Sequence, residues 1–193
     1  LLVFTSDNGP VWYESDVERF GHDSSGGLRG MKADAWECGH RMPFIVRWPG
    51  SVAAGSTSHQ TVCFTDLLAT FSDVVGASLS GDAGPDSFSF FDVLKGSQAD
   101  DVAVRQHLVM RSGGGVMTIR FKDWKLIQGL GSGGFSKPSR IKPAKDEAPG
   151  QLYNLKADPA EEHDVYASHP ELVAEMTAKL EAVKNAKGQR FAK

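Results

Sequence analysis

The sequence predicts an α/β fold, in which an α/β sheet is followed by a small antiparallel sheet and a C-terminal helix. The four apolar residues 1–4 run directly into the turn residues T-S-D-N-G-P, which is typical of a buried strand in an α/β sheet. Short apolar or alternating segments at 107–110, 116–121 and 124–127 predict a meander of antiparallel strands. Apolar residues at helical spacing after residue 170 predict a helix that covers this meander.

The composition is that of an ordinary globular domain. The 193 residues are 40% apolar and 23% charged, and the net charge of −3 provides no long-range field to attract nucleic acid or an anionic membrane. No apolar run is long enough to predict a transmembrane helix. Cys38 and Cys63 match no zinc-binding spacing, and we expect two unpaired thiols. Because the chain opens inside an apolar run without an initiator methionine, we expect it to be a fragment.

Between the first strand and the meander, the sequence predicts one further strand and one helix. Residues 11–27 are polar, lack an apolar period and are expected to form a long loop. Residues 44–48 predict a strand that ends in W-P-G. Thr65 is expected to cap a helix that ends at Gly76, with Asp66 in its first turn. The apolar stripe of this helix is expected to pack on the sheet.

The last third of the chain completes the small sheet and its helix. Residues 129–150 are rich in Gly, Ser, Pro and Lys and predict a flexible surface loop, while residues 152–155 predict a last strand. The pattern S-H-P-E that begins at Ser168 resembles a capping box, so we expect a helix of about 17 residues from there. The Lys- and Arg-rich C-terminus is expected to fray.

Asp7 and Asn8 are the first candidates for a functional site, because they stand where the first strand is expected to end. In open α/β sheets, ligands bind beyond the carboxyl ends of the strands. One charged and one neutral oxygen donor suit Ca²⁺ or Mg²⁺. The same two residue types are also common in simple turns, so a turn is the alternative for this pair taken alone.

Four motifs follow one another in the first fifty residues: S-D-N-G at 6–9, L-R-G-M-K at 28–32, E-C-G-H-R-M-P at 37–43 and W-P-G at 48–50. Together they resemble the sulfatase family, the arylsulfatase-like branch of the alkaline phosphatase superfamily, in order and spacing. A weaker similarity continues to the C-terminus. Cys38 stands where the family has glycine, which would strain the backbone if that position needs a positive φ.

The resemblance implies an α/β fold of the alkaline phosphatase type. Residues 1–99 would form the C-terminal part of the large sheet domain, and residues 100–193 a small α+β subdomain. It also implies hydrolysis of sulfate esters with bound Ca²⁺, Mg²⁺ being the less favoured cation, held partly by Asp7 and Asn8. Lys32 would contact the sulfate group, although a lysine in a turn is commonly only a solvated surface residue.

The resemblance also bears on the other candidate residues. His40 is a candidate for substrate binding, with a merely exposed ring as the alternative, whereas Glu37 and Arg41 are expected to form a structural ion pair or to bond to the backbone. The implied nucleophile is a formylglycine made from Cys or Ser in a C/S-x-P-x-R motif. Neither Cys38 nor Cys63 begins such a motif. We therefore expect the nucleophile to lie in an N-terminal half outside this chain, and the chain alone to be inactive.

Two other functions are open. Phosphate or phosphonate ester hydrolases of the same superfamily place Asp-His at the equivalent strand end and use Zn²⁺, so Asn8 favours the calcium-dependent sulfatases. A non-catalytic binding module is the other alternative, although no cluster of aromatic and basic residues supports it. The expected substrate is an aryl sulfate or a sulfated glycan, with no nucleic acid or membrane partner. The resemblance implies a periplasmic or secreted protein, and open strand edges predict self-association.

Overall fold

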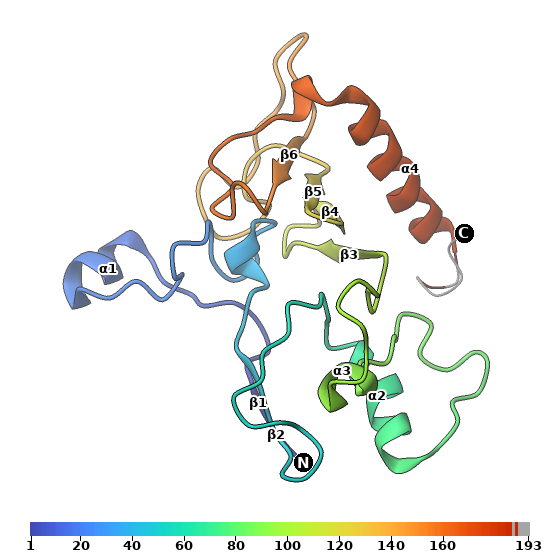
Figure 1. Cartoon of the computed structure of the whole chain (residues 1–193). Helices are drawn as coiled ribbons and strands as arrows, with labels where there is room; N and C mark the ends of the chain where they lie inside the picture. Colours follow the sequence, from blue (N-terminus) through green and yellow to red (C-terminus); the bar gives the residue numbers. More distant parts are fainter. Residues whose placement is uncertain (187, 189–193) are drawn as a thin grey trace. The chain divides into compact units, whose positions relative to one another are not determined.

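The computed structural model describes residues 1–186 and 188, and the described chain forms two compact units (Figure 1). The first unit contains Leu1–Phe4, Ile45–Leu108 and the described residues from Lys179 onward. The second unit contains Thr5–Phe44 and Val109–Ala178. The expected division between residues 99 and 100 stays a prediction. The expected fraying of the C-terminus concerns residues 187 and 189–193, which lie outside the described part of the chain.

The two predicted strands of the larger sheet are present and pair with each other. Strand β1 (Leu2–Thr5) pairs with β2 (Phe44–Arg47), and within the described residues this sheet has no other strand. The prediction that residues 1–4 are buried is wrong for this chain. Leu2 is 62%, Phe4 59% and Ile45 58% exposed, because no further layer covers these side chains among the described residues. An exposed apolar strand face of this kind favours association with another protein surface.

Helices α2 (Asp66–Val75) and α3 (Phe91–Lys95) also belong to the first unit. Helix α2 ends at Gly76 in the left-handed conformation, as predicted. Thr65 occupies the N-cap position, as predicted, but its side chain makes no capping hydrogen bond, because its hydroxyl donates to the Asp86 carbonyl at 3.1 Å. The apolar stripe is only partly covered by the described residues, because Leu67 and Val74 are half-buried whereas Val75 is 74% exposed.

A short helix that the sequence did not predict interrupts the expected loop at 11–27. Helix α1 spans Glu14–Phe20 and has no buried residue, so it lacks the apolar period by which a helix is recognised in a sequence. Its ends are defined by local chemistry instead. The carboxylate of Asp16 accepts a hydrogen bond from the Tyr13 N–H at 3.0 Å, and Gly21 ends the helix with a φ of 62°.

The small antiparallel sheet agrees with the predicted meander. Its strands are β3 (His107–Arg111), β4 (Met117–Phe121), β5 (Trp124–Ile127) and β6 (Gln151–Asn154), in that order across the sheet. The predicted two-residue turn at 122–123 joins β4 to β5, with Phe121 opposite Trp124. Ile119, Leu126, Ile127 and Leu152 are at most 1% exposed, so the core of the second unit lies on this sheet. Burial of these side chains supplies the main apolar stabilisation of the unit.

The C-terminal helix α4 (Pro170–Asn185) confirms the predicted helix, but its start differs from the prediction. Ser168 lies in the short 3₁₀ helix η2 (Tyr166–Ser168), so the helix starts after His169 and not after a capping serine. The His169 ring contacts the Trp124 ring of β5, with 5.0 Å between their centroids. Met176 is fully buried. Among the described residues, no helix is both long enough and apolar enough to cross a membrane.

The exposed apolar face of β1 and β2 predicts that the 193-residue chain self-associates. Replacing Phe4 and Ile45 together by lysine should raise the monomer fraction measured by sedimentation velocity, because two charges then oppose each contact between apolar faces. Phe135→Lys is the matched control, since Phe135 is 47% exposed in the second unit. Equal monomer fractions for the double variant and the unmodified chain would contradict the prediction.

Candidate functional site

The structure places Asp7 and Asn8 just after β1, as predicted, and leaves their oxygens available. Asp7 is exposed, and its carboxylate has no hydrogen bond to any described residue. Asn8 is half-buried, and its Nδ2 donates to the Gly9 carbonyl at 2.9 Å. Its Oδ1 has no partner within the described residues. An exposed carboxylate beside an unused amide oxygen is a donor set that fits Ca²⁺ or Mg²⁺. Metal binding by the pair stays a prediction.

A hollow of about 430 Å³ in the second unit brings Asn8 together with Arg41. Its lining residues come from the turn after β1, the segment before β2 and the loop after α1: Ser6, Asn8, Gly9, Pro10, Val11, Ser24, Arg41, Met42 and Pro43. Neither Lys32 nor His40 lines this hollow. Of the predicted site residues, only Asn8 lines this hollow. Arg41, which was expected to have a structural role, lines it as well.

Lys32 is tied by its backbone to the same turn. Its N–H donates to the Pro10 carbonyl at 2.7 Å, two residues beyond Asn8. Its ammonium has no hydrogen bond or ion pair with any described residue and the side chain is half-buried. A cation without an internal partner suits an incoming anion. Whether Lys32 shares a cleft with Asp7 stays a prediction.

The short 3₁₀ helix η1 (Glu37–Gly39) supports the turn that carries Asn8. The Gly9 N–H donates to the Gly39 carbonyl at 3.2 Å. A Cβ atom added to Gly9 would overlap the Cys38 carbonyl oxygen, and one added to Gly39 would overlap the Asp34 carbonyl oxygen. Both glycines are therefore required by close backbone approach rather than by their φ angles.

The concern that Cys38 strains the backbone is wrong. Cys38 is not among the non-glycine residues with a positive φ, so a cysteine fits there as well as a glycine. Both cysteines are free, as expected. Burial raises the pKa of the Cys38 thiol and of the Cys63 thiol above the ordinary value, so neither thiol has the lowered pKa of an activated nucleophile.

Glu37 is buried and is the centre of a network of ion pairs. Its Oε2 lies 3.3 Å from Arg41 Nη1 and 3.4 Å from Arg120 Nη1, and its Oε1 lies 3.1 Å from Lys125 Nζ. The expected Glu37–Arg41 ion pair is thus confirmed. Burial alone would raise the pKa of Glu37, but the charges of Lys125 and Arg120 outweigh it and hold the pKa below its ordinary value.

Lys125 and Glu161 complete this network, in roles that the sequence analysis did not predict for either residue. The Lys125 ammonium is fully buried and lies 3.0 Å from Glu161 Oε1. Glu161 Oε2 accepts the backbone N–H of Glu37 at 2.5 Å. Burial is the main cause that raises the pKa of Glu161 above its ordinary value. A lysine in an apolar strand segment and a glutamate after an Asp-Pro turn are the only signals that the sequence contains.

His40 faces this network and not solvent. Its Nε2 lies 3.2 Å from the Ala35 carbonyl oxygen and 3.5 Å from Lys125 Nζ. Burial, together with the charge of Lys125, lowers the pKa of His40 to about 4. The ring is therefore neutral near pH 7, and its Nε2–H can donate to Ala35. The alternative of a merely exposed ring is wrong, whereas substrate binding by His40 stays a prediction.

Arg29 of the L-R-G motif is a structural residue. Its Nη1 donates to the Glu161 carbonyl at 2.7 Å and to the Tyr153 hydroxyl at 3.2 Å. Its guanidinium lies 3.8 Å from the centre of the Trp36 ring. These contacts attach the segment before Lys32 to the small sheet, so the neighbouring residues of one motif have different roles.

A pattern overlooked at the sequence level lies in the loop after β5, where residues 136–140 read S-K-P-S-R and so fit C/S-x-P-x-R. The Ser136 hydroxyl donates to Asp34 Oδ2 at 2.5 Å, and its N–H donates to Asp34 Oδ1 at 3.1 Å. Asp34 is buried, and its carboxylate also accepts the Met31 N–H at 2.8 Å. The two Ser136 bonds fasten the loop to the segment beside Lys32, which is a structural task. A nucleophile outside this chain stays the prediction.

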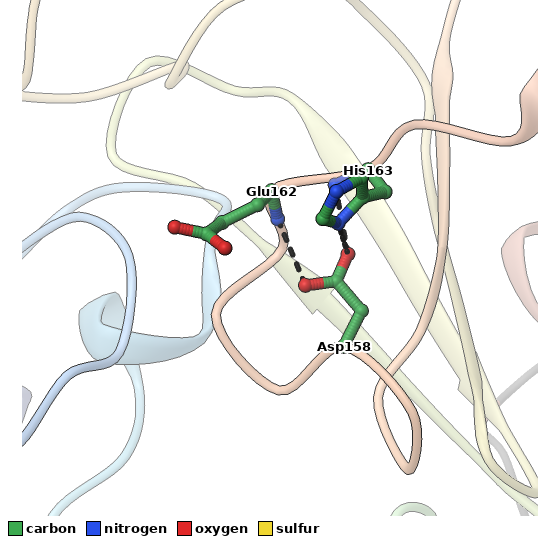
Figure 2. Close-up of side chains that lie close together, drawn as sticks. All are labelled: Asp158, Glu162 and His163. Atoms are coloured by element: carbon green, nitrogen blue, oxygen red, sulfur yellow. Dashed lines mark hydrogen bonds and ion pairs between the residues drawn. The ribbon is translucent and has the colours of Figure 1, made fainter.

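Figure 2 shows a second group of potential metal ligands, Asp158, Glu162 and His163. The Asp158 carboxylate accepts the N–H of Glu162 at 3.0 Å and the N–H of His163 at 2.8 Å. Slight burial opposes these bonds, but they hold the pKa of Asp158 below its ordinary value. Asp158 therefore closes a surface turn.

The mixed α/β fold, together with the structural match that follows, defines the class of the chain as a part of an alkaline-phosphatase-like domain. A solved structure from work on glycosaminoglycan metabolism by Bacteroides thetaiotaomicron matches 96% of this chain and 38% of its own, with a TM-score of 0.80 and 34% identity. A sulfatase from Pseudoalteromonas sp. shares the fold, with a TM-score of 0.68 and 24% identity over 93% of this chain and 36% of its own.

The sequence comparisons give matches to sulfatases. Residues 1–77 match the family model described as Sulfatase. The N-acetylgalactosamine-6-O-sulfatase of Bacteroides thetaiotaomicron is 36% identical over 95% of this chain and 36% of its own length. The ulvan-active sulfatase of Formosa agariphila is 30% identical over 82% of this chain and 35% of its own. The chain thus matches a portion of a sulfatase along nearly its whole length, and it spans about a third of these relatives.

The lowered pKa of His40 predicts a pH-dependent stability. Because the folded pKa of about 4 lies below the ordinary value of 6.5, the unfolded chain binds a proton that the folded chain does not. This contribution is complete above pH 6.5 and is lost as the pH falls toward 4. His40→Gln should therefore reduce the difference between the free energies of unfolding in urea at about pH 7 and about pH 5. The control is His59→Gln at an exposed site; an unchanged difference in His40→Gln would refute the prediction.

The bonds between Ser136 and Asp34 predict that Ser136→Ala affects stability and not chemistry. The loss of a hydroxyl donor to a buried carboxylate should lower the free energy of unfolding by about 1–3 kcal/mol, measured in urea. In the longer protein that contains this chain, sulfate ester hydrolysis should persist. Ser139→Ala, in the same S-K-P-S-R pattern, is the control. Full loss of hydrolysis at unchanged stability would instead make Ser136 the nucleophile.

Proposed function

We propose that this chain is the C-terminal part of a sulfatase that removes sulfate groups from glycans. The observation that carries the proposal is the arrangement at the end of β1. There Asp7 and Asn8 keep oxygens without internal partners, beside a hollow and a segment that carries the unpaired ammonium of Lys32. The family match of residues 1–77 covers all three residues.

A bound Ca²⁺ would neutralise negative charge on the sulfate oxygens as the ester bond breaks. Asp7 and Asn8 would supply two of its oxygen ligands. Because Ca²⁺ takes six to eight oxygens, the remaining ligands would come from outside this chain. Lys32 would hold a sulfate oxygen as a compact cation with three donors. The formylglycine nucleophile belongs to the part of the protein outside this sequence.

The proposal favours a glycan substrate over a simple aryl sulfate. The N-acetylgalactosamine-6-O-sulfatase is 36% identical over 95% of this chain, and the ulvan-active sulfatase is 30% identical over 82%. The arylsulfatase G of Canis lupus familiaris is also 30% identical over 83% of this chain, so the preference for a glycan rests on the higher identity to the first relative. The arylsulfatase of Hemicentrotus pulcherrimus is 39% identical, but over only 49% of this chain.

The test uses the longer protein that contains this chain, with Asp7→Ala and Lys32→Ala as separate variants. Asp7→Ala should abolish tight Ca²⁺ binding, measured by calorimetry, together with hydrolysis of a sulfated glycan. Lys32→Ala should retain Ca²⁺ but lower kcat/KM at least tenfold, or about 1.4 kcal/mol, because it removes a cation that stabilises the transition state. Lys156→Ala, at an exposed lysine, is the matched control.

Stoichiometric Ca²⁺ in the Asp7→Ala variant would refute the metal assignment. Tight binding of Zn²⁺ in place of Ca²⁺, together with hydrolysis of a phosphate ester, would favour the phosphatase alternative. Faster turnover of an aryl sulfate than of any sulfated glycan would refute the substrate class. The 193-residue chain alone, assayed with Ca²⁺, is expected to be inactive and serves as the negative control.

A further inference from the structure

We propose that Lys125 is a positioning residue for the metal-binding turn, acting from the small sheet through η1 on Asn8. The proposal rests on the proposed function, because it takes Asp7 and Asn8 as metal ligands. Lys125 lies in β5 and is fully buried, so it cannot touch a substrate itself. Its effect on the site must therefore pass through the residues that it contacts.

The first step is the pairing of the Lys125 ammonium with two carboxylates. Its ammonium lies 3.1 Å from Glu37 Oε1 and 3.0 Å from Glu161 Oε1. The sheet register places Lys125 opposite Arg120 on β4, so two cations are cross-strand neighbours. Like charges directly opposite repel. The two buried carboxylates provide the compensating negative charge, and their attraction to the buried ammonium fixes their positions.

The second step is a hydrogen bond between the backbone of η1 and the Glu161 carboxylate. Glu161 Oε2 accepts the Glu37 N–H at 2.5 Å, so Glu37 is held both by its side chain and by its main chain. Glu161 is fully buried and has a φ of 54°, in the left-handed region. A non-glycine residue is kept in that region only when its surroundings determine its conformation.

The third step runs from η1 to both predicted site segments. Gly39 O accepts the Gly9 N–H at 3.2 Å, and Gly9 directly follows Asn8. The Cys38 N–H donates to the Arg29 carbonyl at 3.0 Å, in the motif that ends with Lys32. All of these residues belong to the second unit. The path from Lys125 to Asn8 thus consists of the ion pair with Glu37, the backbone of η1, the hydrogen bond between Gly39 and Gly9, and the peptide bond to Asn8.

A network of this kind contributes specificity rather than a large net stability. Buried ion pairs cost desolvation, and well-packed apolar residues can often replace them without loss of stability. What apolar residues cannot supply is a unique placement of the η1 backbone by directional bonds. Outer partners that orient metal ligands typically contribute tenfold to a hundredfold in metal affinity.

The experiment measures Ca²⁺ affinity by calorimetry and the apo Tm in the longer protein. The main variant is Lys125→Met with Glu161→Gln, which removes one charge of each sign and keeps an acceptor for the Glu37 N–H. Its Ca²⁺ affinity should fall by roughly tenfold or more. The matched control is Arg105→Met with Asp66→Asn, a buried ion pair of the first unit. The control should lower Tm and leave Ca²⁺ affinity within about twofold.

The outcomes separate this inference from the proposed function. Equal Ca²⁺ affinity of the unmodified protein and Asp7→Ala would refute the proposed site. An Asp7-dependent affinity that the Lys125→Met/Glu161→Gln variant retains would refute the positioning role. The positioning role would also be refuted if the Arg105→Met/Asp66→Asn control lost as much Ca²⁺ affinity as the main variant for the same decrease in Tm. If the main variant does not fold, Glu161→Gln alone decides, because weaker Ca²⁺ binding supports the role and unchanged binding overturns it.

Discussion

The second unit depends on neutralising one buried ammonium. Lys125 is fully buried in β5, where an unpaired charge would cost several kcal/mol. Glu37 and Glu161 come from segments far apart in the chain to meet it, 88 residues and 36 residues away. Separating either carboxylate from Lys125 would leave a buried charge without its partner. The motif segment and the small sheet therefore form one structure.

This constraint divides the motif residues into two groups. Arg29, Glu37 and Gly39 are occupied by internal bonds or by close backbone packing. Asp7 and Lys32 have side chains without a polar partner among the described residues. Such a division is the arrangement expected of a preorganised site, in which rigid neighbours hold the groups that meet a ligand.

The sequence predicted those features that leave a local pattern. Strands β1 to β6 and helix α4 follow from apolar runs, alternation and turn residues, and the motifs located Asp7, Asn8 and Lys32. Helix α1 escaped prediction because it buries nothing. The position of Thr65 at the start of α2 was predicted correctly, but its hydroxyl bonds elsewhere.

The long-range network could not be predicted in the same way. A lysine in a strand normally extends to solvent, and nothing local distinguishes Lys125 from such a residue. The pairing of Ser136 with Asp34 spans 102 residues. In the sequence, S-K-P-S-R fits the motif of a nucleophile, whereas in the fold its serine fastens a loop to Asp34.

The separation of Glu37 and Lys125 also sets an order of events during synthesis. A ribosome that adds about 5–20 residues per second needs roughly ten seconds to reach the lysine after it has made the glutamate. During that time the segment with Asp7 and Asn8 lacks the bonds that fix η1. The turn with Asp7 and Asn8 therefore becomes fixed late in synthesis, only when the C-terminal strands have emerged, and premature termination before β5 yields a turn without its support.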